Sequence, residues 1–223
     1  MKTVRLEGSN EAIRVEKIFC LGRNYAAHAK EMSAEVGNTP VIFLKPPSAL
    51  VENGATVMIP PVGKELHHEV EMVVVIGQRV RNVRVEDAYD CVGGYAVGLD
   101  MTLRDVQTEA KKKGLPWTVA KGFDTSAPVS LVAERARVNN PHGLDLRLKV
   151  NGKVRQNSNT ANMVFNVDFL VSYLSSIFTL EPGDLIFTGT PEGVGQVHAG
   201  DILEAELESV GTLRVGVVNG PLQ

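Results

Sequence analysis

Apolar residues gather in short runs along this chain, and most runs have the composition or the alternation of β-strands. Alternating apolar and polar positions are typical of a strand with one buried face, and an unbroken valine-rich run is typical of a strand covered on both faces. Runs with helical spacing are fewer. The predicted strands are Val15–Leu21, Val41–Lys45, Thr56–Ile59, Glu69–Gly77, Gly94–Asp100, Asp145–Val150, Leu185–Thr188, Ile202–Leu207 and Thr212–Asn219, and the predicted helices are Tyr25–Met32, Val85–Ala88, Leu103–Lys113 and Val167–Ser176.

The order of these elements favours one fold class. Strands and helices do not alternate regularly, so an α+β, strand-rich fold is expected rather than a doubly wound parallel sheet. Asn151-Gly152, between alternating apolar residues, predicts a tight hairpin with a type I′ turn. Residues 1–14 are polar and irregular and are expected to form a short N-terminal extension, folded as a small hairpin, before a single main domain at residues 15–223.

Composition and charge exclude several classes of function. The 223 residues carry a net charge of −3, which gives no electrostatic footprint for nucleic acid or for an anionic membrane. No stretch approaches the roughly 18 apolar residues of a membrane span, and the first residues lack the apolar core of a signal peptide, so a cytoplasmic protein is expected. Cys20 and Cys91 lie in apolar contexts and are predicted to be buried free thiols.

Two acids interrupt the most apolar of the predicted strands. Glu69 and Glu71 are two residues apart, so their side chains point to the same face, where two like charges repel unless a proton or a cation intervenes. Asp100 ends another apolar run and offers a third carboxylate. An all-oxygen set suits Mg²⁺ or Mn²⁺ better than Zn²⁺. The alternative is a solvated edge strand with ordinary surface acids, but the valine-rich continuation argues for a strand covered on both faces.

A predicted short helix carries a second candidate group. His28 and Glu31 are three residues apart and can meet on one helix face, where the carboxylate would hold the imidazole in one tautomer as a general base for water. The alternative is an ordinary pair on a helix surface, which stabilises by a few tenths of a kcal/mol.

Cationic and polar residues follow the third acid. Arg104 and Gln107 lie on the helix after Asp100, and Arg104 could clamp a substrate carboxylate or, alternatively, pair with a nearby acid on the helix surface. Lys121 lies between small and aromatic residues, a setting that suits stabilisation of an oxyanion. A surface lysine whose charged end reaches solvent is the alternative for Lys121.

The segment 187–195 is a glycine-rich loop after a strand, but it is not a phosphate loop. It lacks the Gly-Lys-Ser/Thr ending, and no helix clearly follows it. Its backbone amides and the Thr190 hydroxyl could still bind a carboxylate or carbonyl oxygen. A purely structural turn is the alternative.

Taken together, these residues resemble the fumarylacetoacetate hydrolase superfamily, and within it the small acylpyruvase or fumarylpyruvate hydrolase type. The resemblance covers nearly the whole chain, and the joint order of its motifs is specific. The motifs are Gly22-Arg23-Asn24-Tyr25 with His28 and Glu31, Phe43-Leu44-Lys45-Pro46, His68-Glu69-Val70-Glu71, Leu99-Asp100-Met101-Thr102 with Arg104 and Gln107, Lys121-Gly122-Phe123-Asp124, and Thr188-Gly189-Thr190-Pro191-Glu192-Gly193-Val194-Gly195.

The resemblance implies the family's strand-rich mixed β-roll with few short helices, as a catalytic domain at residues 15–223, and a homodimer. It implies Mg²⁺ or Mn²⁺ held by Glu69, Glu71 and Asp100. The implied catalytic residues are His28 and Glu31, on a helix that orders when substrate binds, and Lys121, and the implied substrate contacts are Arg23, Lys45, Arg104, Gln107 and Thr190. The larger enzymes that name the family have a further metal-binding acid before the catalytic histidine, where this chain has Phe19-Cys20-Leu21-Gly22, so three protein ligands are expected.

The activity expected from this resemblance is hydrolysis of a 3-acylpyruvate, such as acetylpyruvate or fumarylpyruvate, to pyruvate and a carboxylic acid. The substrate would be a small 2-oxo acid chelated by the metal, with water activated by His28 and Glu31. The same chemistry serves oxaloacetate decarboxylation, and within the family also isomerisation or decarboxylation of unsaturated dioic acids in aromatic catabolism. A non-catalytic metal-binding or interaction module is the alternative from another class.

Overall fold

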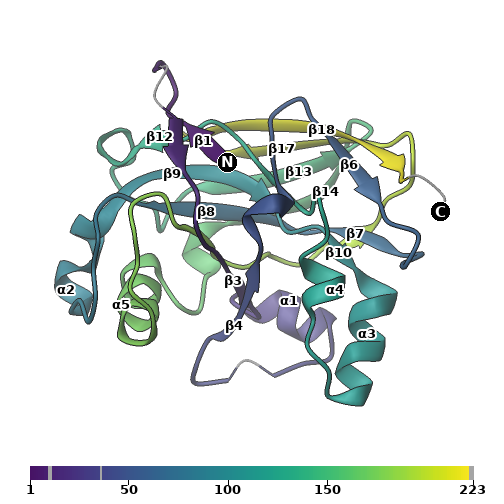
Figure 1. Ribbon diagram of the computed structural model, residues 1–223, viewed down its shortest axis with the longest axis horizontal. Helices are drawn as coiled ribbons and strands as arrows, with labels where there is room; N and C mark the ends of the chain where they lie inside the picture. Colours follow the sequence, from purple (N-terminus) through teal and green to yellow (C-terminus); the bar gives the residue numbers. More distant parts are fainter. Residues whose placement is uncertain (10–11, 36, 221–223) are drawn as a thin grey trace.

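The computed structural model describes residues 1–9, 12–35 and 37–220, and two sheets form its body (Figure 1). The larger sheet contains β3 (Ile18–Gly22), β4 (Val41–Lys45), β5 (Leu50–Glu52), β8 (Val70–Ile76), β9 (Val92–Leu99), β11 (Ala127–Val129), β12 (Ala133–Glu134) and β15 (Leu185–Phe187). The smaller sheet contains β6 (Thr56–Ile59), β13 (Asp145–Val150), β14 (Lys153–Asn159), β17 (Ile202–Leu207) and β18 (Gly211–Asn219). The strand order is β4-β3-β15-β8-β9-β11-β5 in the larger sheet, with β12 beside β9, and β14-β13-β17-β18-β6 in the smaller one.

Short strands and helices surround these sheets. The short strands are β1 (Thr3–Arg5), β2 (Ala12–Arg14), β7 (Leu66–His68), β10 (Thr102–Leu103) and β16 (Gly195–Gln196). The α-helices are α1 (Ala26–Glu31), α2 (Val85–Ala88), α3 (Arg104–Lys113), α4 (Thr118–Lys121) and α5 (Val167–Ile177), and single 3₁₀ turns lie at Pro47–Ala49, Tyr89–Cys91, Arg135–Arg137 and Thr160–Asn162. In Figure 1, α3 and α4 lie side by side, and α2 packs against α5 on the opposite flank. Among the described residues, no helix is both long and apolar enough to cross a bilayer.

The fold is an α+β, strand-rich mixed β-roll, as predicted. Most neighbouring strands are antiparallel, but β15 pairs with β3, β11 with β5 and β18 with β6 in parallel. These pairings join strands that are far apart in sequence. The fold therefore depends on contacts between distant segments, which bring residues from the whole chain to one site.

The two predicted hairpins are present. Asn151 and Gly152 both have positive φ, 51° and 76°, as a type I′ turn requires, and they join β13 to β14. At the N-terminus β1 pairs with β2, and Val4 and Val15 are buried against the larger sheet. The division of the chain at residue 14 into an extension and a main domain stays a prediction.

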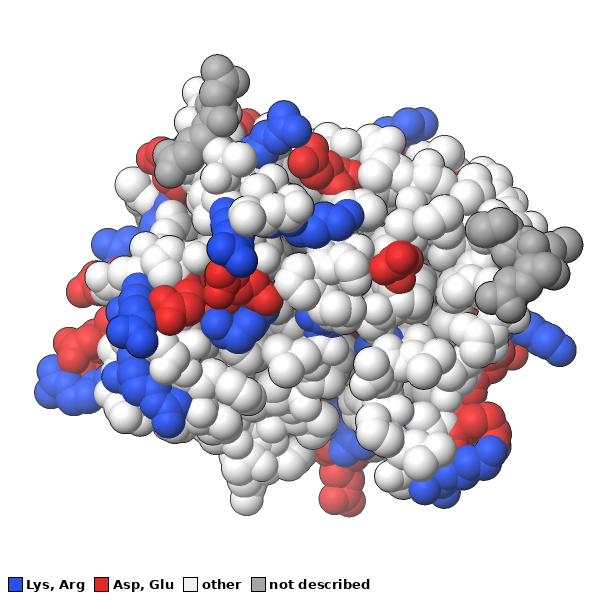
Figure 2. Space-filling view, viewed as in Figure 1, with Lys and Arg blue, Asp and Glu red and all other residues white. Residues whose placement is uncertain are grey.

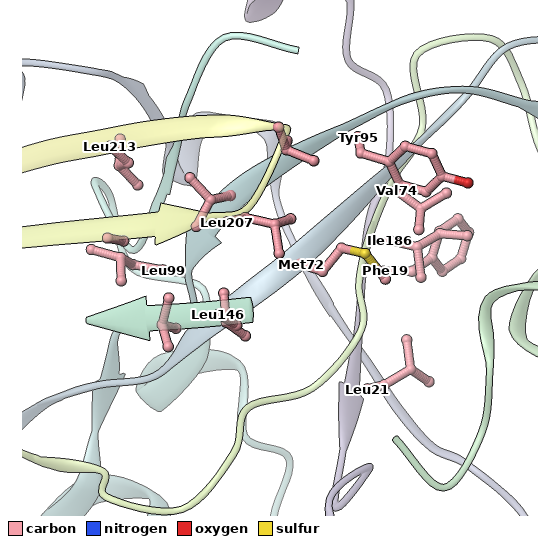
Figure 3. Packing of buried hydrophobic residues seen from close by; sticks show 14 of the residues in the cluster. Phe19, Leu21, Met72, Val74, Tyr95, Leu99, Leu146, Ile186, Leu207 and Leu213 are labelled. Atoms are coloured by element: carbon pink, nitrogen blue, oxygen red, sulfur yellow. The ribbon is translucent and has the colours of Figure 1, made fainter. Parts of the chain in front are cut away.

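The main core lies between the two sheets. Alternate residues of the strands in the smaller sheet are buried, and Figure 3 shows Leu146, Leu207 and Leu213 of that sheet facing Met72 and Leu99 of the larger one. Burying an aliphatic side chain of this size stabilises the fold by about 1.5–3 kcal/mol. The period-2 pattern seen in the sequence therefore marks the face that holds the sheets together.

Some elements have no clear signal in the sequence. β14 is polar, with the sequence KVRQNSN, and forms because the tight turn folds it back onto β13. The helix α4 spans only four residues, too few for a periodic pattern. Cys20 and Cys91 are buried free thiols, as predicted.

Gly98, in β9, lies where β8 and β15 approach this strand closely. A Cβ at this position would lie 2.6 Å from Val73 Cγ2 and 2.7 Å from Phe187 Cε1. We expect Gly98→Ala to lower the free energy of unfolding by about 1–3 kcal/mol, because the tightly packed strands must move apart. Urea unfolding checks this, with Gly216→Ala as the control, since its Cβ would lie 3.8 Å from Ile202 Cδ1. An equal stability of the two variants would contradict the expectation.

Candidate metal centre and active site

Three carboxylates meet where β8 and β9 pair. Glu69 immediately precedes β8, Glu71 is its second residue, and Asp100 directly follows β9. The antiparallel register places Val70 opposite Leu99, and the Asp100 amide donates to the Glu69 carbonyl at 2.8 Å. A carboxylate oxygen from each acid lies within 4.8 Å of the others. Pairing of these strands therefore assembles the predicted ligand set.

The acids are buried, which excludes the alternative of a solvated edge strand. β8 lies inside the larger sheet between β15 and β9, and all its residues are buried. Val74 packs in the core between the sheets, and Val73 and Val75 pack in a second cluster on the other face. The valine-rich run is thus covered on both faces, as predicted.

Burial and charge act differently on two of the acids. Burial alone would raise the pKa of Glu69, but Lys121 and Arg104 outweigh burial and hold that pKa below its ordinary value. For Glu71, burial and the charges of Asp100 and Glu69 raise the pKa well above its ordinary value. Glu71 has no ion pair within the described part of the chain, so it is the carboxylate that lacks positive charge.

Two cations lie directly on the carboxylates. The Lys121 ammonium donates to Glu69 Oε2 at 2.8 Å and to Asp100 Oδ2 at 2.7 Å. Burial opposes its charge, but Asp100 and Glu69 raise the pKa of Lys121 above the ordinary value. Arg104 donates from Nη2 to Glu69 Oε1 and from Nη1 to Gln107 Oε1, the latter at 2.7 Å. Neither residue is the exposed surface cation that was the alternative.

Lys45 occupies a different place from the other predicted substrate contacts. Its buried ammonium lies 2.9 Å from Asp100 Oδ1 and donates to Ser126 Oγ at 3.1 Å and to the carbonyls of Met101, at 3.2 Å, and Lys121. Lys45 is not among the residues that line the pocket above the three carboxylates. This position supports orientation of Asp100 more than the direct substrate contact predicted for Lys45.

The His28–Glu31 pair forms on α1. His28 Nδ1 lies 3.2 Å from Glu31 Oε2, and the Gly193 amide donates to Glu31 Oε1 at 3.1 Å. The carboxylate thus engages Nδ1, which leaves Nε2 as the ring atom that can exchange a proton. His28 is buried and lines the same pocket as the three acids.

The glycine-rich loop donates hydrogen bonds to two carboxylates, that of Glu71 in the acidic set and that of Glu31 on α1. Gly189 has a φ of 95°, and its amide donates to Glu71 Oε2 at 2.7 Å, while the Gly193 amide holds Glu31. The Thr190 hydroxyl donates to the Val70 carbonyl at 2.8 Å. Amides of this loop therefore bind carboxylates, and these carboxylates belong to the chain itself.

Two buried amide side chains fix this loop, and sequence reasoning gave neither a role. Asn24 donates to the carbonyls of Thr188 and Phe165, at 2.7 and 2.9 Å. Gln156, from the polar strand β14, donates to Thr190 Oγ1 at 2.8 Å and accepts from the Val70 amide. A lone Gln in a polar run carries no signal of burial, so only the pairing of β14 with β13 reveals it.

A pocket opens on the acids, and most of the predicted site residues line it. These are Arg23, His28, Glu69, Glu71, Asp100, Arg104, Gln107, Lys121 and Thr190. Sequence reasoning missed further lining residues, among them Met32, Phe43, Lys111 and Trp117. An apolar residue is read from sequence as part of the core and a lone lysine as part of the surface, so only the tertiary structure places these residues at the pocket.

The chain is similar to known proteins over most of its length. A family model described as the C-terminal domain of fumarylacetoacetate (FAA) hydrolase matches residues 17–218. The chain belongs to the fumarylacetoacetate hydrolase family. This confirms the resemblance inferred from the sequence motifs.

Relatives and solved structures in this family include enzymes of two kinds. The chain is 53% identical over 201 residues to the mitochondrial oxaloacetate tautomerase of Arabidopsis thaliana, covering 90% of each chain. It is 50% identical over 195 residues to the human mitochondrial oxaloacetate tautomerase, covering 87% of this chain and 88% of the relative. Its structure is similar to that of fumarylpyruvate hydrolase from Pseudomonas aeruginosa in complex with Mn²⁺ and pyruvate, with a TM-score of 0.93, 39% identity, and coverage of 98% of this chain and 96% of that one.

The residues present fit a divalent cation. The three acids offer only carboxylate oxygens, which suit hard cations such as Mg²⁺ and Mn²⁺. Among the residues described, none donates a hydrogen bond to Asp100 Oδ1 despite its proximity to Lys45, and the Gly189 amide is the one donor to the Glu71 side chain. A divalent cation among the three acids would supply the positive charge that Glu71 lacks.

This charge balance predicts that Glu71→Gln changes the melting temperature differently without and with metal. Without metal, the variant should melt at a higher temperature than the wild type, because a buried carboxylate without a cationic partner is replaced by a neutral group of the same shape. With Mg²⁺ or Mn²⁺ added, only the wild type should gain in melting temperature, because binding to the native state stabilises it.

Differential scanning calorimetry with and without metal measures both effects. Glu86→Gln is the control, because Glu86 is an exposed acid that does not line the pocket and its loss should leave the metal response unchanged. A Glu71→Gln protein that still gains the wild-type increase in melting temperature on metal addition would refute the assigned ligand.

Proposed function

We propose that this chain is a metal-dependent enzyme that interconverts the enol and keto forms of oxaloacetate. The observation that carries the proposal is the position of His28, whose imidazole is fixed by Glu31 and lines the same pocket as the carboxylate set. The tautomerase relatives, about half identical over nearly their whole length, support the choice of substrate.

The charge of the pocket favours a dianionic substrate. Four basic side chains and three carboxylates line it, so a bound divalent cation leaves a surplus of positive charge. Over the face of the molecule in Figure 2, by contrast, basic and acidic side chains are interspersed. The surplus complements a 2-oxo dicarboxylate such as oxaloacetate.

The chain's own residues would then move the proton. When bound, a divalent cation (Mg²⁺ or Mn²⁺) would draw electrons from the 2-oxo group and make the hydrogens on carbon 3 more acidic. Nε2 of His28 takes a proton from carbon 3 to form the enolate, whose oxygen takes up a proton from solvent to give the enol. In the opposite direction the enol oxygen loses its proton to solvent and the His28 imidazolium returns one to carbon 3. Glu31 balances the imidazolium, and the Lys121 ammonium stabilises negative charge that develops on the substrate oxygen.

Substitution of the base tests this mechanism. His28→Asn should lower the rate of enol-to-keto conversion by about 100-fold or more, because it removes the group that exchanges the proton. The decay of the enol's ultraviolet absorbance after mixing with enzyme and Mg²⁺ measures that rate. Lys30→Ala, an exposed change on the same helix, is the control and should leave the rate unchanged. A His28→Asn protein that works at the wild-type rate would exclude the proposed role.

A second candidate function is hydrolysis of a 3-acylpyruvate. It is favoured by the contacts that fix the Glu31 carboxylate, which lies 3.2 Å from His28 Nδ1 and accepts a hydrogen bond from the Gly193 amide. The same dyad can take a proton from water, whose oxygen bonds to the distal carbonyl carbon while the carbon–carbon bond on the pyruvate side breaks. The electrons of that bond pass to the pyruvate fragment, which takes up a proton, so fumarylpyruvate would give pyruvate and fumarate. The fumarylpyruvate hydrolase structure supports this candidate.

Glu31→Gln separates the two functions. Hydrolysis must stabilise an imidazolium next to an attacking water, so loss of the carboxylate charge should reduce pyruvate release from fumarylpyruvate by about 100-fold. The rate of oxaloacetate tautomerisation should fall by about tenfold or less, because carbon 3 of oxaloacetate is more acidic than water. Coupled assay of pyruvate and the enol absorbance assay are run on the same protein. Release of CO₂ from oxaloacetate at the rate of enol loss would instead identify a decarboxylase.

A further inference from the structure

One face of α3 continues from the metal centre to the mouth of the pocket. Arg104, Gln107 and Lys111 are spaced three and four residues apart, so they lie along the same side of the helix, and all three line the pocket. Arg104 and Gln107 are buried, whereas Lys111 is exposed. Long helical side chains lean toward the helix N-terminus, which here is the direction of the acids.

Lys111 differs from the two lysines that follow it. Lys112 and Lys113 both pair with Glu109, at 3.1 and 3.8 Å, on the outer side of the helix. Lys111 forms no ion pair within the described residues, and its ammonium lies 5.1 Å from the ring centroid of Trp117, another pocket residue. Interaction with the helix C-terminus is common to all three lysines and does not explain why only Lys111 lines the pocket.

The cations of the pocket divide into two groups. Arg104 and Lys121 are engaged by Glu69, and Lys121 also by Asp100. Lys111 and Arg23 have no carboxylate partner among the residues described, and the one hydrogen bond of Arg23 is to the Glu35 carbonyl at 3.5 Å.

These free cations repel each other. Partial desolvation of the ammonium by the neighbouring residues, together with the repulsion of Arg104 and Arg23, lowers the pKa of Lys111. An anion held between Lys111 and Arg23 would relieve this repulsion and form charge-assisted hydrogen bonds.

We propose that Lys111, together with Arg23, binds the carboxylate at the far end of a 2-oxo dicarboxylate whose 2-oxo acid end lies at the metal centre. Lys111 is then a specificity residue that makes the enzyme prefer dicarboxylates to monocarboxylates. This inference rests on the proposed function, since it assigns the second carboxylate of that substrate class.

A matched pair of ligands isolates the far carboxylate. 2-Oxoglutarate and 2-oxopentanoate have the same chain length and the same chelating end, and they differ only in a terminal carboxylate or methyl group. Isothermal titration calorimetry at saturating Mg²⁺ gives the dissociation constant of each. The wild type should prefer 2-oxoglutarate, and Lys111→Met should reduce that preference by about tenfold, the effect of one charge-assisted hydrogen bond.

The variants on the same helix turn complete the test. Lys112→Met removes an equal charge from the outer side and should keep the wild-type preference, and Lys111→Arg should restore most of it. In turnover of oxaloacetate, Lys111→Met should raise KM about tenfold and leave kcat within twofold. A wild type without a preference for 2-oxoglutarate, or a Lys111→Met protein that weakens both ligands equally, overturns the proposal. Because the ligand pair is measured by binding, absence of oxaloacetate turnover would refute the proposed function without deciding the role of Lys111.

Discussion

Three buried carboxylates within a few ångströms of one another are the constraint on which this structure depends. Moving each ionised acid out of water costs several kcal/mol, and their mutual repulsion adds to that cost. The pairing of β8 with β9 nevertheless places Glu69, Glu71 and Asp100 together, and two layers of apolar side chains cover β8. The core between the sheets thus stabilises an arrangement of acids that would otherwise be unfavourable.

The surroundings of the acids offset this cost unevenly. Lys121 and Arg104 pair with Glu69, and the Lys45 ammonium lies 2.9 Å from Asp100 Oδ1. In the part of the chain that the structure describes, the Glu71 side chain accepts one hydrogen bond, from the Gly189 amide. Such an uneven balance is typical of a site built for a cation, because full compensation by side chains would leave a metal without an electrostatic advantage. Unbalanced charge is thus concentrated at the candidate metal centre.

The sequence predicts those parts of the fold and site that local patterns determine. The valine-rich run after Glu69 indicated a strand covered on both faces, and Asn151-Gly152 indicated the hairpin turn. The His28–Glu31 contact follows from helical spacing alone. The burial of Gln156 in a polar strand could not be predicted, because it depends on contacts with a loop about 35 residues away in the chain. The same holds for the site of Lys45, whose partners come from three other segments.

Both candidate reactions make the same demands on this scaffold. Each needs a 2-oxo acid held at one end by a divalent cation and a base beside the chain that extends from it, which would take a proton from carbon 3 in tautomerisation or from a water molecule in hydrolysis, so the metal centre does not distinguish them. The distinction must come from the dyad and from the outer part of the pocket. Glu31, which accepts hydrogen bonds from the Gly193 amide, would matter most when a water molecule has to be activated, whereas Arg23 and Lys111 would act on whichever group lies farthest from a bound metal. Specificity can therefore change at the pocket mouth while the carboxylate set stays constant, which agrees with the presence of a tautomerase and a hydrolase among relatives that share this fold.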